Sequence, residues 1–143
     1  MRIVQKYGGT SVGTIEKIQN IARHLKGLKK NGNDLVVVVS AMGKMTDELI
    51  QKAKQINPTP NRRELDRLMS TGEQQTIALL SMALHAEGID AISLTGFQAG
   101  IKAEGLYTKA KIKDINVDRI ENHLEEGKVV IVAGFQGYNE DGD

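Results

Sequence analysis

An unbroken apolar run, Leu35 to Val39, constrains the fold of this 143-residue chain more than any other segment. A strand with no polar alternation is typical of a position buried on both faces, as in the middle of a parallel sheet. Three further strand-like segments occur at Arg2 to Lys6, Ala91 to Leu94 and Val129 to Val132. The sequence therefore predicts a mainly parallel sheet with the Leu35 to Val39 strand inside it.

Segments with apolar residues three and four positions apart separate these strands, which is the pattern of amphipathic helices. We expect helices capped by Thr14 and by Thr46, a short polar helix at Arg62 to Leu68, and helices at Ser70 to Gly88 and Val117 to Gly127. Alternating strands and helices imply right-handed crossovers that cover both faces of the sheet. The predicted fold class is α/β, with three layers in the order helix, sheet, helix.

Short glycine-containing segments follow the predicted strands, at Tyr7 to Thr10, Ser40 to Gly43, Thr95 to Gly96 and Gly134 to Gly137. In an open parallel sheet these segments share one edge, and ligands bind at that edge. Glycine permits close approach of the backbone, so four such segments indicate a ligand site there. A further segment, Lys109 to Ile115, reads as an edge strand.

Composition excludes several classes of function. The chain has no cysteine, 19 Lys and Arg against 18 Asp and Glu, and 3% aromatic residues with no Trp. These numbers give no basic surface or stacking platform for nucleic acid, and no apolar run is long enough to span a membrane. The three histidines fall on predicted helices without metal-ligand spacing, so we expect no metal site in the protein. The absence of cysteine fits a cytoplasmic protein.

Lys6, Gly8, Gly9 and Thr10 form the first candidate site. A lysine at a strand end, followed by free backbone N–H groups and a helix start, suits a phosphate. The segment matches neither the P-loop nor the dinucleotide-binding spacing. An ordinary turn with a solvated lysine explains the same residues equally well.

Two further candidates are the hydroxyls of Ser40 and Thr46 and the carboxylate of Glu73. The hydroxyls flank a small-residue loop and could bind a substrate carboxylate or amine, whereas Thr46 could simply cap its helix. Ser70 to Glu73 matches a capping box, in which Glu73 would bond back to the backbone. In the alternative interpretation, Glu73 faces the ligand site and binds an ammonium group.

Five segments, in the same order along the chain, resemble signature sequences of the aspartate kinases within the amino acid kinase family. They are Lys6 to Val12, Val38 to Gly43 with Thr46 and Asp47, Ser70 to Glu73, Leu94 to Ile101, and Ala133 to Gly137. The kinases for glutamate, acetylglutamate, carbamate and UMP share only the lysine and glycine start of this series. The resemblance spans nearly the whole chain and implies the carbamate kinase-like fold of that family.

The resemblance implies ATP-dependent phosphorylation of the β-carboxylate of L-aspartate, the first step of lysine, threonine and methionine biosynthesis. By this resemblance Lys6 contacts the transferring phosphoryl group, while Gly8, Gly9 and Thr10 line the phosphate loop. Ser40, Thr46 and Glu73 bind aspartate. ATP enters with Mg²⁺, and the parent enzyme is expected to be a homo-oligomer.

Aspartate kinases continue well beyond this length, through a second lobe of the kinase domain and regulatory ACT domains. We therefore expect residues 1 to 143 to be the N-terminal lobe of the kinase domain, inactive alone. The alternative is a naturally short, non-catalytic module that binds a ligand or a partner. A sheet cut midway leaves an unpaired edge, so we also expect self-association or a loosened segment near residues 129 to 137.

Overall fold

The computed structural model describes all residues from 1 to 143 and contains a four-stranded parallel sheet. Its strands are β1 (Arg2–Tyr7), β2 (Asp34–Val39), β6 (Val129–Ala133) and β3 (Ala91–Leu94), adjacent in that order. All three pairings are parallel, so the four carboxyl ends meet at one edge. The predicted α/β class and parallel sheet are confirmed.

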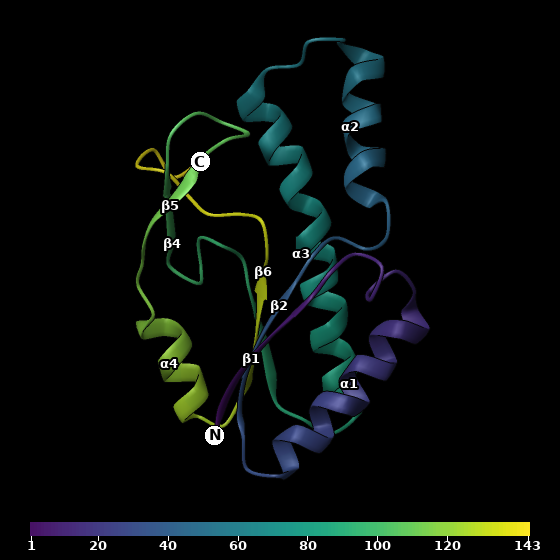
Figure 1. Ribbon diagram of the computed structural model, residues 1–143, viewed down its shortest axis with the longest axis vertical. Helices are drawn as coiled ribbons and strands as arrows, with labels where there is room; N and C mark the ends of the chain where they lie inside the picture. The colour runs from purple at the N-terminus through teal and green to yellow at the C-terminus, as the bar shows by residue number, and fades with distance from the viewer.

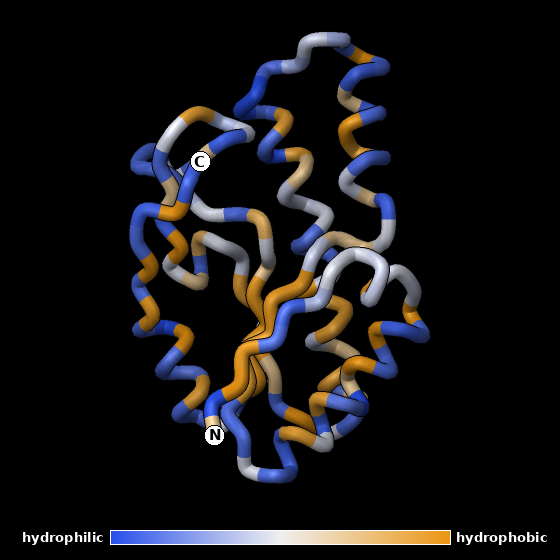
Figure 2. Tube along the Cα trace, viewed as in Figure 1, coloured by the Kyte–Doolittle hydropathy of each residue, from blue (hydrophilic) through white to orange (hydrophobic).

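Helices cover both faces of this sheet and make three layers (Figure 1). Helices α1 (Ile15–Lys30) and α3 (Arg62–Ala86) lie on one face, and α4 (Asp118–Glu125) lies on the other. The larger core, 15 buried residues, lies between the sheet and α1 with α3. Five buried residues form a smaller core beneath α4. Apolar residues concentrate along the central strands, with hydrophilic residues on the outer helix surfaces (Figure 2).

Helix α1 begins where the sequence predicts. The side chain of Thr14 accepts a hydrogen bond from the N–H of Lys17 at 3.1 Å, which satisfies one unpaired donor of the first turn. Glu16 in the first turn and two lysines in the last turn complement the helix dipole. Gly32 follows the helix with a positive φ of 85°, a conformation that glycine adopts without steric cost.

Strand β2 is internal, but only one of its faces is fully buried. Leu35, Val37 and Val39 have no exposed surface, whereas Val36 and Val38 are half-buried. The reason is that α4 packs against β6, leaving the same face of β1 and β2 less covered. Only β6 is buried along its whole length, so the expectation of two buried faces is wrong for β2 and correct for β6.

Helix α3 corrects two predictions, because one helix of 25 residues replaces the two expected at Arg62 to Leu68 and Ser70 to Gly88. Asn61 caps the helix by accepting from the N–H of Glu64. The hydroxyls of Ser70 and Thr71 donate to carbonyl oxygens three residues earlier, as hydroxyls inside a helix do. The capping box predicted at Ser70 to Glu73 is therefore wrong, and Glu73 lies in mid-helix.

Helix α2 (Met45–Ile56) begins two residues earlier than a helix capped by Thr46 would. Lys44 is its N-cap residue and makes no side-chain cap hydrogen bond. Thr46 lies within the first turn, so its predicted capping role is wrong. In Figure 1, α2 and the first half of α3 extend beyond the carboxyl edge of the sheet.

The segment predicted as an edge strand belongs to a separate hairpin. Strand β5 (Lys111–Ile115) pairs antiparallel with β4 (Ile101–Glu104), a strand that the sequence did not predict. All five residues of β5 are exposed, which explains its weak apolar pattern. The hairpin lies above the carboxyl edge, across from α2 and α3 in Figure 1.

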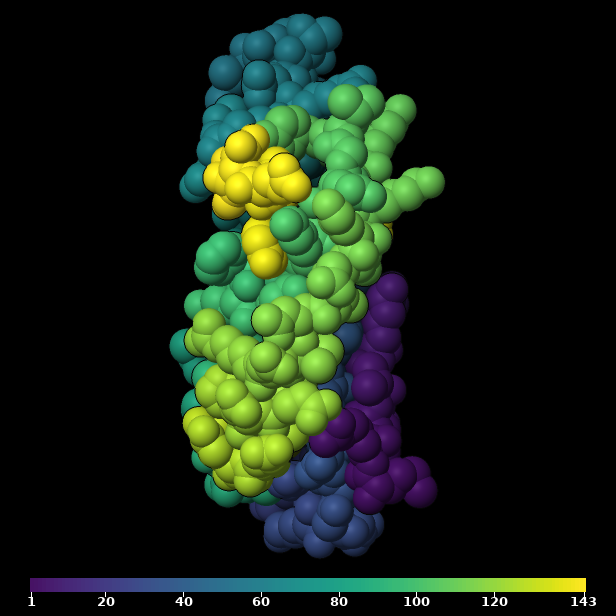
Figure 3. All heavy atoms as spheres, turned by 90° about the vertical axis from the view of Figure 1, so that its left-hand side faces the viewer, coloured from purple at the N-terminus to yellow at the C-terminus, as the bar shows by residue number.

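The edge strands of the main sheet are β1 and β3, while β6 is central. Residues 129 to 133 therefore do not form the loosened edge that the sequence suggested. Val4 on β1 is 67% exposed, and Figure 3 shows β1 at the margin of the face that carries α4. No helix is both long enough and apolar enough to cross a membrane.

Candidate functional site at the carboxyl edge of the sheet

The loop after β1 packs directly on the loop after β2, at the carboxyl edge where the sequence places a ligand site. A Cβ atom on Gly9 would lie 2.9 Å from the carbonyl oxygen of Gly43 and 3.0 Å from that of Ala41. Only glycine allows two backbones to approach this closely. Gly9 is therefore required for the close contact between the two loops.

The first loop leaves backbone donors free. The N–H groups of Gly8, Gly9 and Thr10 donate to no acceptor of the chain. The carbonyls of Tyr7 and Gly9 accept from the N–H groups of Ser40 and Gly43, at 3.1 and 2.9 Å. Because N–H and C=O point in opposite directions across a trans peptide, the N–H groups of Gly8 and Thr10 point away from the second loop. They are oriented for an external acceptor such as a phosphate.

Lys6 brings a full positive charge to the same loop. It is the penultimate residue of β1, exposed, and forms no ion pair with a carboxylate. It alternates with Gln5 and Tyr7, which face α1, so Lys6 lies on the opposite face of the strand. The Tyr7 hydroxyl donates to the side chain of Gln5 at 2.6 Å, and burial raises the pKa of this tyrosine. Tyr7 thus anchors the strand end, and Lys6 remains free.

Helix α3 reaches the two loops through Gly72. A Cβ atom on Gly72 would lie 2.8 Å from the Cβ of Ala41, the residue whose carbonyl meets Gly9. Ala41 therefore lies between the first loop and α3. The next residue, Glu73, is only 7% exposed and accepts no hydrogen bond from another residue. Burial raises the pKa of its carboxyl group above the ordinary value.

Ser40 and Thr46 lie at the two ends of the second loop. Ser40 directly follows β2, and its N–H is bonded to Tyr7, while its hydroxyl has no partner in the chain. Thr46 is half-buried in the first turn of α2, and its hydroxyl is also unpartnered. The structure therefore places both free hydroxyls on the loop that packs against the first one. Their roles in binding a substrate stay predictions.

Gln136 connects the loops after β3 and β6, which the sequence placed at one edge, to α3, a link that sequence reasoning did not predict. Its side-chain nitrogen donates to the carbonyl of Ser70 at 3.1 Å, and its side-chain oxygen accepts from the N–H of Gly96 at 3.4 Å. Gly96 itself would place a Cβ 2.5 Å from the carbonyl of Gln136. The loops after β3 and β6 therefore pack as closely as the other pair. The sequence signals were the glycines at 134 and 137 and the resemblance of Ala133 to Gly137 to a family signature.

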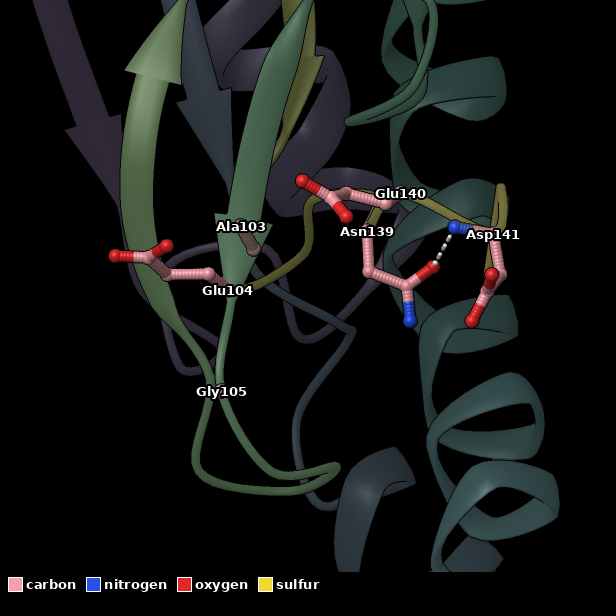
Figure 4. Close-up of a pocket in the computed structure, with 6 residues that line it drawn as sticks. All are labelled: Ala103, Glu104, Gly105, Asn139, Glu140 and Asp141. Atoms are coloured by element: carbon pink, nitrogen blue, oxygen red, sulfur yellow. Dashed lines mark hydrogen bonds between the residues drawn. The ribbon is translucent and has the colours of Figure 1, made fainter.

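A shallow hollow of about 270 Å³ lies elsewhere, between β4 and the C-terminal segment. Carboxylates of Glu104, Glu140 and Asp141 line it, and Figure 4 shows the Asn139 side chain bonded to the backbone of Asp141. Its acidic lining is unsuited to a phosphate. Asp143 is paired with Arg63 and bonded to Tyr107, and the ion pair lowers the pKa of Asp143. No group of three or more acidic or histidine residues is placed to hold a metal ion.

The carboxyl edge thus combines two kinds of polar group. One end offers an ammonium group and free N–H groups, which attract anions. The other offers the buried carboxylate of Glu73, which attracts an ammonium group. This attraction is stronger in low-dielectric surroundings than in water. A small molecule with a positively charged group could bind the carboxylate, while a phosphate group beside it binds the ammonium and N–H groups.

Known proteins resemble this chain in sequence and in fold. The chain is 57% identical over 141 residues to an aspartokinase from Bacillus sp. (strain MGA3), an alignment covering 99% of this chain and 34% of that protein. The crystal structure of aspartate kinase from Synechocystis is 56% identical, with a TM-score of 0.80, covering 96% of this chain and 22% of that chain. The chain therefore spans about a third of the length of the curated relative.

The fold also matches a structure of much lower sequence identity. E. coli aspartokinase III, in complex with aspartate and ADP, is 18% identical with a TM-score of 0.83, covering 99% of this chain and 42% of that chain. At this identity the likeness concerns the fold alone. The sequence profile of the amino acid kinase family matches residues 1–143, the whole chain. The chain therefore belongs to the amino acid kinase family.

Proposed function

We propose that residues 1 to 143 form the N-terminal lobe of the catalytic domain of an aspartate kinase. The activity is transfer of the γ-phosphoryl group of ATP to the β-carboxylate of L-aspartate. The observation that carries the proposal is the 57% identity to an aspartokinase across nearly the whole chain. The alignment spans 99% of the chain and therefore includes the segments of the candidate site.

The phosphates of ATP are assigned to the loop after β1. Support comes from the free N–H groups of Gly8, Gly9 and Thr10 and from the unpaired charge of Lys6. In phosphoryl transfer, charge spreads over the equatorial oxygens of the transferring group, so catalysis consists largely of positioning and electrostatic stabilisation. Lys6 supplies the mobile positive charge for that group, and the backbone supplies fixed dipoles.

L-Aspartate is assigned to the second loop and α3. The buried carboxylate of Glu73 accepts no hydrogen bond from another residue and suits the amino group of the substrate. The hydroxyls of Ser40 and Thr46 are free to bond a substrate carboxylate or amine. The complex of E. coli aspartokinase III with aspartate and ADP supports amino acid and nucleotide as the two ligands of this fold.

The reaction needs no nucleophile from the protein. A β-carboxylate oxygen of aspartate attacks the γ-phosphorus of ATP, the bond from that phosphorus to the bridging β–γ oxygen breaks, and ADP leaves with the electron pair. The products are 4-phospho-L-aspartate and ADP, and no proton is transferred. This agrees with a site of lysine, glycine and hydroxyl groups in a chain without cysteine.

Mg²⁺ is assigned to the nucleotide rather than to residues of this chain. Bound to ATP, it neutralises phosphate charge. Because no cluster of three acidic or histidine residues is placed to hold an ion, we name no protein ligand for it. Lys6 and the N–H groups of the first loop bind the remaining phosphate oxygens.

The rest of the enzyme is proposed to lie in the two-thirds of the relatives' length that this chain does not span. That part includes the second lobe with the adenine pocket, further aspartate contacts and regulatory ACT domains. We propose that the whole enzyme is a cytoplasmic homo-oligomer acting at the start of lysine, threonine and methionine biosynthesis.

The test is ATP-dependent formation of acyl phosphate by the full-length protein, trapped as the hydroxamate. We expect product with L-aspartate, and none with L-glutamate, N-acetyl-L-glutamate or carbamate. We expect no product from the isolated 143-residue chain under the same conditions. Equal activity with glutamate would contradict the proposed substrate, and activity of the isolated chain would contradict its role as a single lobe.

A further inference from the structure

Lys17, a residue of α1 outside the loops described above, is bonded to the loop after β1 through its side chain and to the helix cap through its backbone. Its side-chain nitrogen donates to the carbonyl of Thr10 at 2.9 Å. Its backbone N–H donates to the side chain of Thr14 at 3.1 Å. One residue of the first helical turn therefore ties the helix to the distal part of the loop after β1.

The Thr10 carbonyl depends on this lysine more than on the backbone. Its other donor is the N–H of Gly13, at a long 3.4 Å. The proximal part of the loop is held independently, because Gly8 accepts from Ser11 at 3.0 Å and Gly9 accepts from Gly43 at 2.9 Å. A bond from a charged donor is shorter and stronger than a neutral one, so the Lys17 ammonium is the main restraint on the Thr10 carbonyl.

Lys17 is also free of carboxylates. Lys17 forms no ion pair, unlike Lys26 on the same helix, which lies 3.6 Å from a glutamate oxygen. The ammonium group of Lys17 points to the loop, where it donates to the carbonyl of Thr10.

We propose that Lys17 is a positioning residue for the phosphates of the nucleotide. By holding the Thr10 carbonyl, its ammonium group keeps the loop in the conformation that exposes the N–H groups of Gly8, Gly9 and Thr10. Loss of Lys17 lets this carbonyl turn, so that it competes with the incoming anion. The inference rests on the proposed function, because it takes the loop after β1 as the phosphate site.

The test uses the full-length protein with Lys17→Met, Lys17→Arg and Lys30→Met, and Mg-ADP as the probe. Lys30 is the matched control, since it is an exposed lysine at the far end of α1 without an ion pair. We expect Lys17→Met to weaken Mg-ADP binding by about tenfold in calorimetry, which corresponds to about 1.4 kcal/mol. We expect KM for ATP to rise by a similar factor. KM for aspartate should change less than about twofold, which corresponds to about 0.4 kcal/mol or less.

The conservative variant separates positioning from general stability. Arginine keeps a charged donor, so Lys17→Arg is expected to restore most of the Mg-ADP affinity, and Lys30→Met to match wild type. In Lys17→Met, faster amide exchange at Gly13, whose N–H donates to the Thr10 carbonyl, with unchanged exchange in β3, supports the same conclusion. Unchanged Mg-ADP affinity in Lys17→Met, or an equal loss of affinity for ADP and aspartate, would overturn the proposal.

The calorimetric readout also separates this inference from the proposed function. A full-length protein that binds Mg-ADP but forms no aspartyl phosphate would refute the proposed substrate. The comparison of Lys17→Met with wild type would remain interpretable in that case. A wild-type protein that does not bind Mg-ADP would refute both.

Discussion

The buried carboxylate of Glu73 is proposed to bind the substrate, but its charge lowers the stability of the ligand-free protein. It is 7% exposed, accepts no hydrogen bond from another residue, and burial raises the pKa of its carboxyl group above the ordinary 4.5. The folded state therefore binds this proton more tightly than the unfolded state does. The free energy of unfolding decreases as pH rises from the unfolded pKa through the folded pKa, and the ionised carboxylate destabilises the protein at higher pH.

Replacing Glu73 by glutamine is expected to raise the melting temperature of the ligand-free protein at neutral pH. The difference from wild type should disappear well below pH 4.5, where both side chains are neutral. The same variant should lose affinity for aspartate by roughly thirtyfold or more, since an unpaired buried charge partner costs about 2 kcal/mol or more. Thermal melting across pH and substrate titration measure the two effects.

The control for this prediction is Glu48→Gln on α2, an exposed glutamate without an ion pair. It should leave both the pH dependence of melting and the aspartate affinity unchanged. A Glu73→Gln protein that melts lower than wild type at neutral pH would show that the carboxylate is paired and stabilising.

Among the helices and strands, α3 shows most clearly which features the sequence could predict and which it could not. The sequence predicted a short polar helix before Met69 and a helix with apolar spacing after it, and residues on both sides are helical in the structure. The stretch Ser70 to Glu73 carries hydroxyl, glycine and carboxylate residues, which predict a helix start when judged locally. Tertiary contacts decide otherwise, because Gly72 packs against Ala41 and Gln136 bonds to Ser70. Local sequence could not reveal partners that lie in other loops.

The same limit applies to the hairpin and to β2. Strand β4 has only four residues and β5 is exposed throughout, so neither carries a strong alternation of apolar and polar residues. The apolar run of β2 predicted its internal position, while its half-buried face reflects where α4 packs. Loop positions at the carboxyl edge were predictable because every strand of the main sheet is parallel.

Gly72→Ala is expected to destabilise the protein although alanine is the better helix former. The gain in helix propensity is about 1 kcal/mol. The added methyl would lie 2.8 Å from the Cβ of Ala41, and overpacking of this kind costs about 1–3 kcal/mol. We therefore expect a lower melting temperature and weaker binding of aspartate, because α3 must move away from the second loop.

Gly27→Ala in α1 is the matched control, because a Cβ at that position meets nothing within 4 Å. It should stabilise the protein by about 0.5–1 kcal/mol. If Gly72→Ala raised the melting temperature as much as Gly27→Ala does, the close contact between α3 and the second loop would be refuted.

The whole molecule carries an open sheet edge. Strand β1 has a neighbour on one side only, and Val4 on it is 67% exposed beside the half-buried Val36. Unpaired strands with exposed apolar residues promote association between chains. We expect the isolated 143-residue chain to self-associate in sedimentation experiments at rising concentration.

A charge on the edge should reduce this association. Val4→Lys is expected to shift the isolated chain toward monomer, because charged residues block edge pairing. Ile56→Lys, at an 88% exposed apolar residue that ends α2, serves as the control and should leave association unchanged. Equal effects of the two variants, or a wild-type chain that stays monomeric, would argue against the β1 edge as the contact.

The central claim is that phosphoryl transfer takes place at the carboxyl edge of the sheet, with Lys6 on the transferring group. The most direct test is the rate of ATP-dependent aspartyl phosphate formation by full-length Lys6→Met, with Lys30→Met as the control. We predict that Lys6→Met lowers kcat by at least about a hundredfold, as loss of one group that stabilises transition-state charge does. Aspartate binding measured by calorimetry should persist. A Lys6→Met enzyme with the wild-type kcat would contradict the account.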